Sequence, residues 1–472
     1  MIYLLICSFV LLMEFVSFYL IKTYQLCSYK LSSFWKNCLA FSFSVGDKNK
    51  LVLTKRLWRF EILYAIICFF LFFVVFLLIN SPFLIILDLI VIFLLIPLWI
   101  SLTHILLFPI EKSIKCYYIL KAKRKIGKKN IIKIGITGSY GKTSVKNILA
   151  QLLSSQYKVC QTPKNYNTEM GMTLTILKEL DDHDVFIAEM GARKKKDIEK
   201  LAKIVKPNYG VITPIGQCHL QTFKRIENIE NTKFELAQNL CLNGQMFFCG
   251  ENFSCEKLYH RFSGNKKLIG KYGSFCYAKN ISYSSRGSEF ELVLGEKILH
   301  VSTKLLGRMN VQNIVLASAV AKTLGVKDEE IAKSISQLSP SAHRMEVITT
   351  NFCTILDDSY NSNEDGFKQA LEVLTMFEGR KIVVTPGMVE LGNAQSEKNF
   401  QLGCQIADCC DYLIIMNDTN KNELLSGAIS HNFKKENIFF AKNRQEQKEL
   451  INLLSCKDCV ILFENDLPDN YQ

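Results

Sequence analysis

Apolar and polar positions divide this chain into a strongly hydrophobic N-terminal part and a longer part with the periods of strands and helices. Three apolar runs fall in the first 110 residues, at about 2–21, 62–79 and 83–108. A helix crosses a bilayer with roughly 20 apolar residues, so each run is long enough to span. The first run has no basic stretch before it, as a secretion signal would, and is expected to be retained. The pattern predicts a membrane domain, residues 1–115, with three transmembrane helices.

Basic residues predict how these helices are oriented. The segment from Lys22 to Arg59 carries eight Lys and Arg and one acid, Asp47, and a second basic cluster lies at 121–129. Because positively charged loops stay on the cytoplasmic side, we expect localisation in the cytoplasmic membrane, with the N-terminus outside and everything after about residue 110 in the cytoplasm. The cluster at 121–129 is expected to contact anionic lipids. A solubilising linker is the alternative, and no aromatic-interleaved basic face supports nucleic-acid binding.

After the apolar runs, strand-like and helix-like segments alternate. Residues 131–137 form a short β-rich run that ends in a glycine turn, and the next segment has apolar residues at helical spacing. Near the end of the chain we expect strands at 352–356, 381–385, 412–416, 438–441 and 460–463, with helices between them at about 364–377, 395–409, 420–429 and 443–455. Such alternation is typical of a parallel sheet with right-handed connections. The fold class is therefore predicted as α/β.

The composition is typical of a multidomain protein with reduced thiols. The 472 residues carry a formal net charge of +13 and are enough for two or three domains. The 17 cysteines are scattered and form no disulfide framework, so we expect free thiols. Cys456 and Cys459 make one C-x-x-C motif, and Cys409 and Cys410 are adjacent. Zinc or redox chemistry there is an alternative, but one pair supplies only half of a tetrahedral site.

The segment GITGSYGKTSVK, residues 135–146, follows the first strand of this part and opens the next helix. It has the lysine and threonine of a phosphate-binding loop, but Ile136 stands where the usual pattern has its first glycine. Backbone N–H groups at a helix start point at anionic oxygens, and the helix dipole favours negative charge there. Lys142 is expected to reach the β- and γ-phosphates and the Thr143 hydroxyl to bind Mg²⁺. An ordinary glycine turn is the alternative.

Further motifs follow along the chain. They are TGSYGKT at 137–143, PKNYNTEMGMTLTIL at 163–177, a segment with EMGA and IGQCHL at 184–223, NTKFELAQNL at 231–240, GRMNVQNIVLASAVA at 307–321, AHRMEVI at 342–348, LDDSYNSN at 356–363 and TPGMVELG at 385–392. In sequence and in order they resemble the motifs of the Mur ligase family, the ATP-dependent amide-forming enzymes of peptidoglycan synthesis. The resemblance covers about residues 130–400 and is greatest to the MurF branch, which joins D-alanyl-D-alanine to UDP-MurNAc-tripeptide.

This resemblance implies a fold and a reaction. A P-loop ATPase-like central domain would span residues 116–340, and a Rossmann-like C-terminal domain would span residues 341–472. The implied enzyme is an ATP-dependent acid–amino-acid ligase of cell wall biogenesis, in which ATP phosphorylates a substrate carboxylate and an amine then attacks the acyl phosphate. The implied cofactors are ATP and two Mg²⁺ ions. The implied partners are a cell-wall precursor, UDP-linked or lipid-linked, and an amino acid or dipeptide.

The resemblance also implies roles for individual residues. The implied ATP-binding residues are Thr137, Gly138, Ser139, Tyr140, Gly141, Lys142, Thr143, Ser144, Asn310, Asn313, Arg344 and Asp358. The implied substrate-binding residues are Asn165, Asn167, Tyr360, Asn361 and Asn363. The implied metal ligands are Thr143, Glu189, His219 and Lys233, and the implied catalytic residues are Lys142, His219 and Lys233. Glu189 and His219 follow predicted strands, where ligands bind in open α/β sheets. Lys233 matches the lysine that the family carbamylates with CO₂.

Departures from the family pattern leave the substrate open. Met309 replaces a histidine, Glu364 replaces a proline, and the final LFENDLPDNYQ lacks the K-G-S-R motif that helps to grip the incoming dipeptide. Membrane helices are predicted where the MurF branch has its UDP-sugar-binding domain. One alternative is therefore a membrane-anchored ligase of the same chemistry that acts on a lipid-linked or other cell-envelope carboxylate. Another is a non-catalytic nucleotide-binding membrane scaffold, against which the retained site residues argue.

Overall fold

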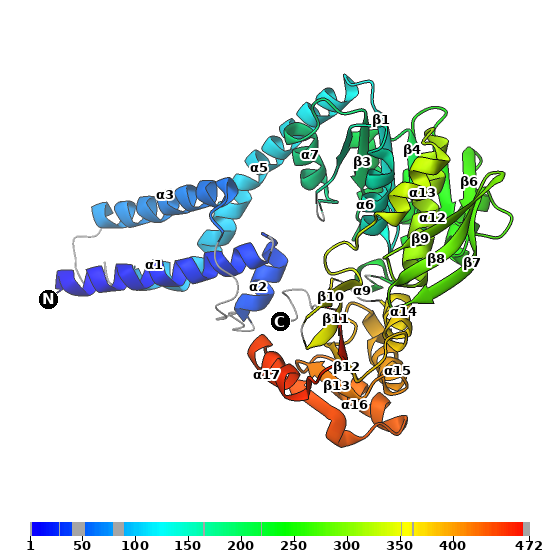
Figure 1. Ribbon diagram of the computed structural model, residues 1–472. Coiled ribbons are helices and arrows are strands. Elements are labelled where there is room, and N and C mark those ends of the chain that lie inside the picture. Colours follow the sequence, from blue (N-terminus) through cyan, green and yellow to red (C-terminus); the bar gives the residue numbers. More distant parts are fainter. Residues whose placement is uncertain are drawn as a thin grey trace. The chain divides into compact units, whose positions relative to one another are not determined.

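The structure, a computed structural model, describes residues 2–27, 29–39, 52–78, 89–163, 166–218, 220–350, 352–360 and 363–465. It separates into two compact units, Met1–Tyr118 and Ile119–Gln472 (Figure 1). The described part of the first unit is helical. The second unit contains three β-sheets and the helices that cover them.

The N-terminal unit packs its helices around a small aromatic and aliphatic core. Helix α1 is Ile2–Leu26, α2 is Leu31–Leu39, α3 is Lys55–Leu78 and α5, whose first part belongs here, is Ile96–Gly127. The most deeply buried core side chains are Tyr24, Phe34, Leu57, Phe60, Ile96 and Ile100. A hydrogen bond between α2 and α5 adds to this packing: the indole N–H of Trp35 donates to the Ser101 hydroxyl at 3.0 Å.

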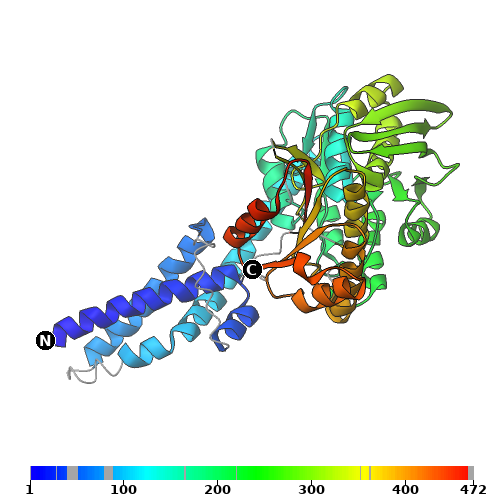
Figure 2. The same cartoon turned by 60° about the horizontal axis from the view of Figure 1, so that its bottom comes forward.

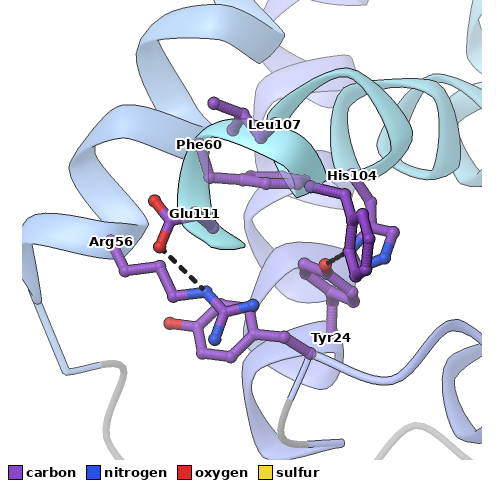
Figure 3. Close-up of a pocket in the computed structure, with 8 residues that line it drawn as sticks. Tyr24, Arg56, Phe60, His104, Leu107 and Glu111 are labelled. Carbon is purple, nitrogen blue, oxygen red and sulfur yellow. Dashed lines mark hydrogen bonds and ion pairs between the residues drawn. The ribbon is translucent and has the colours of Figure 1, made fainter. Parts of the chain in front are cut away.

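A polar cluster between these helices ties them together (Figure 3). The Nε atom of Arg59 donates to Glu111 Oε1 at 2.7 Å, and Arg56 approaches the same carboxylate at 3.8 Å. The Tyr24 hydroxyl is hydrogen-bonded to His104. The cavity between these residues has a volume of only about 20 Å³. The cluster therefore joins α1, α3 and α5 and leaves little room for anything larger than a water molecule.

The first two predicted membrane helices fall in helices of the structure. The run at 2–21 lies in α1, and the run at 62–79 lies in α3 except for residue 79, which is outside the described residues. In the described part of the chain, one helical stretch, Lys55–Val74, is long and apolar enough to cross a membrane, judged by length and composition. Three membrane spans therefore remain a prediction.

The third predicted membrane helix has different bounds in the structure. Residues 83–88 are outside the described residues, and α5 begins at Ile96 and continues beyond residue 108 to Gly127. Pro97 lies in the first turn of α5, where a proline suits a helix start because its fixed φ is helical and it needs no N–H partner. The continuous helix predicted for 83–108 is therefore interrupted before Ile96.

The first half of the second unit is built on a six-stranded parallel sheet. Its strands are β1 (Ile132–Thr137), β2 (Val159–Gln161), β3 (Val185–Glu189), β4 (Tyr209–Ile212), β5 (Gln245–Cys249) and β6 (Asn265–Ile269), in the order β2-β3-β1-β4-β5-β6. All neighbouring pairs are parallel. The chain order changes direction beside β1, and ligands of such sheets bind at the carboxyl ends of the strands next to this point.

Helices cover both faces of this sheet. One face packs against α6 (Lys142–Leu153), α12 (Gly307–Thr323) and α13 (Asp328–Ser336). The other face packs against α7 (Glu169–Lys178), α8 (Asp197–Val205), α10 (Ile226–Gln238) and α11 (Phe253–Arg261), and the short helix α9 (Leu220–Phe223) precedes α10. In β3, Ile187 faces the first layer and Phe186 faces the second. Strands buried on both faces have continuous apolar sequences, as β3 has.

A three-stranded antiparallel sheet, which sequence reasoning did not predict, packs on α12. Its strands are β7 (Cys276–Ser284), β8 (Gly287–Leu294) and β9 (Lys297–Thr303), in that order. Phe290, Leu292 and Leu294 of β8 are buried in one core with α12. Two short turns connect the strands, so neighbouring strands run antiparallel.

The C-terminal domain has a second six-stranded sheet, in the order β10-β11-β15-β12-β13-β14. Its strands are β10 (Glu346–Thr349), β11 (Cys353–Asp358), β12 (Lys381–Thr385), β13 (Tyr412–Met416), β14 (Ile438–Ala441) and β15 (Cys459–Glu464). One face packs against α14 (Glu364–Thr375), α15 (Gln395–Ala407) and α16 (Lys421–Ser430), and the other against α17 (Arg444–Leu454) (Figures 1 and 2). The five strands and four helices predicted for this region are confirmed.

The prediction of a fully parallel C-terminal sheet is wrong at one edge. Strand β10 runs antiparallel to β11, whereas the other neighbouring pairs are parallel. The connection from Thr349 to Cys353 is too short for a crossover, which parallel neighbours require. The sheet is therefore mixed.

The basic cluster at 121–129 lies at the end of α5, in the second unit. Lys125 Nζ donates to Asp181 Oδ1 at 2.8 Å and to Leu177 O at 3.0 Å, and Ile126 is buried against α7. Part of this cluster thus anchors α5 to the central sheet layer. Its contact with anionic lipids remains a prediction.

The cysteines of the described chain are free thiols, as predicted. Cys459 is buried in β15, and the described residues hold no group of three or more His, Cys, Asp or Glu side chains that could bind a metal. The zinc interpretation of Cys456 and Cys459 therefore has no support in this part of the chain.

Candidate active site

The phosphate loop joins β1 to α6 at the carboxyl edge of the central sheet. Gly138 has a φ of 152° and Gly141 a φ of 74°, which glycine adopts more easily than other residues. A Cβ atom at Gly138 would lie 1.9 Å from Thr213 Oγ1, and one at Gly141 would lie 2.5 Å from Asn313 Oδ1. The loop needs both glycines for backbone conformation and for space.

Backbone hydrogen bonds fix the start of this loop. The N–H groups of Ser139 and Tyr140 donate to Pro214 O at 2.9 and 3.2 Å, and the buried Thr137 hydroxyl donates to Met190 O at 2.9 Å. The first N–H groups of a helix have no partner within the helix. Those of Lys142, Thr143 and Ser144 therefore open α6 and are the donors best placed for a phosphate.

Lys142 lies in the first turn of α6 and is folded back over the loop. Its Nζ donates to Ser139 O at 2.8 Å. Burial lowers the pKa of Lys142, and the carboxylate of Glu189 opposes this effect. An incoming phosphate would replace the carbonyl oxygen as the partner of this ammonium group, since a charged acceptor binds it more strongly.

Glu189 ends β3 and is only 2% exposed. Its Oε2 atom accepts from Thr143 Oγ1 at 3.0 Å and lies 3.2 Å from Lys146 Nζ, while its Oε1 atom accepts from Asn167 Nδ2 at 3.1 Å. Burial favours the neutral acid, but the ammonium groups of Lys146 and Lys142 outweigh it and hold the pKa of Glu189 below its usual value. The carboxylate is therefore ionised and held at both oxygens.

Sequence reasoning missed Lys146, which is 1% exposed. Its Nζ also donates to Thr162 O at 2.8 Å, and the Thr162 hydroxyl in turn accepts from Glu189 N at 3.0 Å. The available signal was spacing, because residues four apart lie on one helix face and Lys146 is four residues after Lys142. A lysine within an otherwise apolar buried face needs a partner, and that partner is Glu189.

The donor set at the start of α6 fits Mg²⁺. Ligands of octahedral Mg²⁺ lie about 2.1 Å from the ion, so two adjacent ligands are about 3.0 Å apart. The distance between Thr143 Oγ1 and Glu189 Oε2 is 3.0 Å. Mg²⁺ is usually held by one or two protein ligands together with water and substrate phosphates, rather than by a full protein cage. Thr143 and Glu189 would therefore suffice with a nucleotide present.

Lys233 lies on α10 and is 2% exposed. Burial lowers the pKa of Lys233 to about 8, and the positive charge of Lys142 acts in the same direction. Its Nζ makes no hydrogen bond or ion pair with the residues that the structure describes. A substantial neutral fraction near pH 8 suits an amine that reacts with CO₂, since only the unprotonated form is nucleophilic. Its carbamylation remains a prediction.

A cavity of about 200 Å³ lies beside the phosphate loop. Its lining residues are Tyr140, Gly141, Pro214, Cys249, Glu251, Asn252, Arg308, Met309, Gln312, Asn313, Asp365 and Gln369. They come from the phosphate loop, the ends of β4 and β5, α12 and α14. Of the two asparagines predicted to bind ATP, Asn313 lines the cavity, whereas Asn310 donates to Leu306 O at 2.9 Å and is not among the lining residues. The cavity suits the base and ribose of a nucleotide whose phosphates reach the loop.

The segment after the central domain contributes a second charged group. The Arg344 guanidinium lies 4.0 Å from the centre of the Tyr360 ring, a cation–π contact. Asp358 accepts from Met345 N at 3.1 Å. Burial raises the pKa of Asp358 to about 6, although the positive charge of Arg344 opposes it. Arg344, Asp358 and Tyr360 thus form one cluster, although Arg344 lies in a different motif from Asp358 and Tyr360.

Two predicted substrate-binding residues have other partners in the structure. Asn363 caps α14, because its Oδ1 accepts from Gly366 N at 2.9 Å. Asn167 donates to Glu189, which is a candidate metal ligand. Asn165, His219 and Asn361 are outside the described residues.

Comparisons with known proteins identify the family. The model of the Mur ligase middle domain matches residues 136–321, and that of the Mur ligase, glutamate ligase domain matches residues 343–463. A UDP-N-acetylmuramoyl-tripeptide–D-alanyl-D-alanine ligase of Buchnera aphidicola subsp. Baizongia pistaciae is 31% identical over 337 residues, which cover 69% of this chain and 72% of that protein. The Bacillus subtilis protein of the same name is 28% identical over 336 residues, 70% of this chain and 72% of that protein.

The solved structures agree with this result. The MurF ligase from Thermotoga maritima in complex with ADP superimposes with a TM-score of 0.67 at 26% sequence identity, covering 75% of this chain and 80% of that chain. That protein binds ADP, and its fold matches the part of this chain that contains the phosphate loop. The chain belongs to the Mur ligase family and is an ATP-dependent, MurF-like ligase.

Proposed function

We propose that this chain joins D-alanyl-D-alanine to UDP-MurNAc-tripeptide in the synthesis of peptidoglycan precursors. The observation that carries this proposal is the phosphate loop in which the Thr143 hydroxyl lies beside the buried carboxylate of Glu189, because these two oxygen donors would hold Mg²⁺ next to a bound phosphate. Two relatives of 28% and 31% identity are UDP-N-acetylmuramoyl-tripeptide–D-alanyl-D-alanine ligases, and this supports the choice of substrates.

The residues of the site have complementary roles in this reaction. ATP brings four negative charges to a substrate carboxylate, so catalysis needs cations at the transferring phosphoryl group. Lys142 would bind the β- and γ-phosphates, and Arg344 would bind phosphate from the C-terminal domain. Thr143, Glu189 and a carbamylated Lys233 would hold two Mg²⁺ ions, with His219 as a further ligand; the ions would neutralise charge at the γ-phosphate.

The proposed chemistry has two balanced steps. A carboxylate oxygen of the tripeptide attacks the γ-phosphorus, and the bond from this phosphorus to the β-γ bridging oxygen breaks. ADP is released, and the tripeptide now carries an acyl phosphate. The amine of the dipeptide then attacks the acyl carbon, phosphate leaves with the original carboxylate oxygen, and the nitrogen loses a proton. Positioning the two substrates supplies much of the rate, because it makes both attacks intramolecular.

A second candidate substrate is a lipid-linked or other cell-envelope carboxylate. The observation that favours it is an apolar face on α3, where Ile62, Ile66, Phe69, Phe70 and Phe73 are exposed within the N-terminal unit. A contiguous exposed apolar surface of this kind marks a membrane or protein contact.

We propose that α3 attaches the protein to the cytoplasmic membrane, with the N-terminus outside and the catalytic domains in the cytoplasm.

An acceptor panel tests the proposed function. The full-length protein in detergent, with Mg-ATP and D-alanyl-D-alanine, is offered UDP-MurNAc-tripeptide or its polyprenyl-diphosphate-linked form, and released phosphate is measured. We expect amine-dependent release with the UDP-linked acceptor and none from Lys142→Ala. Release with the lipid-linked acceptor alone would contradict the first candidate and support the second.

A labelling experiment tests the proposed orientation. Single cysteines are introduced on a background in which exposed thiols are replaced, and intact cells are treated with a membrane-impermeant maleimide. We expect a cysteine placed before Ile2 to react and a cysteine at the exposed Lys457 to be protected. Equal labelling of both positions would contradict the orientation.

A further inference from the structure

Lys146 has no role assigned so far, although it lies in the candidate active site and is only 1% exposed. It sits 3.2 Å from Glu189 Oε2, the same oxygen that accepts from Thr143. Burying a lysine is costly unless it is paired, and the structure pairs Lys146 with Glu189 and with Thr162 O. A residue needed only for packing on α6 would not require this charge.

Thr162 holds both members of the pair. Its carbonyl accepts from Lys146 Nζ at 2.8 Å, and its hydroxyl accepts from the backbone N–H of Glu189 at 3.0 Å. Asn167 fixes the other oxygen of the carboxylate at 3.1 Å. The Glu189 side chain is thus oriented toward Thr143 before any ligand arrives.

Without a nucleotide, the charged side chains around Glu189 have a net positive charge. Lys142 and Lys146 carry two positive charges against the single negative charge of Glu189. A divalent ion that used Glu189 Oε2 would share this oxygen with the Lys146 ammonium and be repelled by it. ATP changes the balance, because its phosphates add negative charge beside Lys142.

We propose that Lys146 is a positioning residue that orients Glu189 and makes divalent-metal binding dependent on the nucleotide. In this arrangement the buried carboxylate keeps a counter-ion when the site is empty, and the metal binds together with ATP rather than before it. The inference rests on the metal site in the proposed function.

Metal binding, rather than turnover, tests this inference. Mn²⁺ replaces Mg²⁺ as a paramagnetic probe, and free Mn²⁺ is measured by electron paramagnetic resonance with the full-length wild type, Lys146→Met and Lys146→Arg, each with and without ATP. Because ATP binds Mn²⁺ by itself, the samples with ATP are compared with protein-free samples of the same Mn²⁺ and ATP concentrations. We expect Lys146→Met to bind Mn²⁺ without ATP about tenfold more tightly than the wild type, because one repelling charge is gone. We also expect the enhancement by ATP to fall, and Lys146→Arg, which keeps the charge, to resemble the wild type.

A double variant and thermal unfolding complete the design. Lys146→Met combined with Glu189→Gln should lose the gained affinity, and Mn²⁺ should raise the melting temperature of Lys146→Met more than that of the wild type. A folded Lys146→Met protein with unchanged Mn²⁺ affinity would overturn the inference, while binding of Mn²⁺ with ATP in the wild type would leave the proposed metal site standing. Failure of the wild type to bind Mn²⁺ with ATP would overturn both.

Discussion

The hydroxyl oxygen of Thr143 lies 3.0 Å from Oε2 of Glu189, although 46 positions separate the two residues in the chain. Thr143 opens α6 and Glu189 ends β3, so the parallel pairing of β1 with β3 brings them together. The same pairing places Lys142 beside the carboxylate. This contact links the phosphate loop to the expected metal.

Removing the charge of Glu189 should abolish catalysis more than nucleotide binding. Glu189→Gln keeps the size of the side chain but removes a metal ligand and the partner of Lys146. We expect turnover to fall on the order of 100- to 1,000-fold, the scale for losing one electrostatic stabiliser of a transition state. The affinity for ATP, measured with a fluorescent analogue, should change only a few-fold.

The matched control for this change is Glu179→Gln, at an exposed position after α7. It removes the same charge from the surface and should leave turnover unchanged. Equal effects of the two substitutions would contradict the placement of Glu189 in the site.

Adding a methyl group at Gly138 should disrupt the phosphate loop. The new Cβ would lie 1.9 Å from Thr213 Oγ1, at a φ that alanine rarely adopts. We expect Gly138→Ala to lower the free energy of unfolding by roughly 1–3 kcal/mol and to weaken ATP binding. Urea unfolding measures the first effect. Gly127→Ala is the control, because a Cβ there meets nothing within 4 Å, and it should be neutral or slightly stabilising.

Turnover should depend on CO₂ if Lys233 is carbamylated. The pKa of about 8 implies that the neutral amine is roughly 25 times more abundant at pH 8.5 than at pH 6.5. At fixed dissolved CO₂, activity lost in CO₂-free buffer should therefore return much faster at the higher pH. ¹³C NMR with labelled bicarbonate should show a carbamate carbon in the wild type and none in Lys233→Arg. Full activity without CO₂ would contradict the modification.

Asp358 should make the stability of the protein depend on pH. Its pKa is raised from 3.8 to about 6, and the charged groups that face it are Arg344, Asp357 and Glu464. Folding therefore favours the protonated carboxyl: this contribution is fully present below about pH 3.8 and is lost as the pH rises through about 6. Asp358→Asn should be more stable than the wild type at pH 7.5, by up to about 3 kcal/mol, and equal to it near pH 4.

Exposed Asp418 offers the control for this pH dependence. Asp418→Asn should show a stability difference that does not change between pH 4 and pH 7.5. If the difference between Asp358→Asn and the wild type were likewise constant, the raised pKa would be wrong.

The sequence predicted the parts of the fold whose signals are local. In the C-terminal domain, short apolar runs bounded by polar helices correspond to β12, β13 and β14 at their predicted bounds. The phosphate loop was predicted because glycines, lysine and threonine must occur together for a helix start to bind phosphate. The antiparallel sheet β7–β9 was not predicted, because its strands lie between two motifs of the central domain and contain none themselves.

Site residues could be predicted where they belong to a sequence motif. They could not be predicted where their role depends on a contact with a residue far away in the chain. Lys142, Thr143 and Glu189 meet as expected, since loop and strand end have fixed places in this sheet type. Lys146 and Asn167 act through contacts with a residue far away in the chain, and a lysine or asparagine alone gives no sign of such a partner. Asn363 caps α14, which its sequence context did not indicate, because a helix N-cap and a substrate contact favour the same residue type; its contact with a substrate stays a prediction.

The transfer of an isotope tests the central claim, ligation through an acyl phosphate, most directly. The terminal carboxylate of UDP-MurNAc-tripeptide is labelled with ¹⁸O, and phosphate released with Mg-ATP and D-alanyl-D-alanine is analysed by mass spectrometry. The account predicts one ¹⁸O atom in each phosphate, because the carboxylate oxygen leaves with it. Phosphate without label, or label in AMP, would contradict the account.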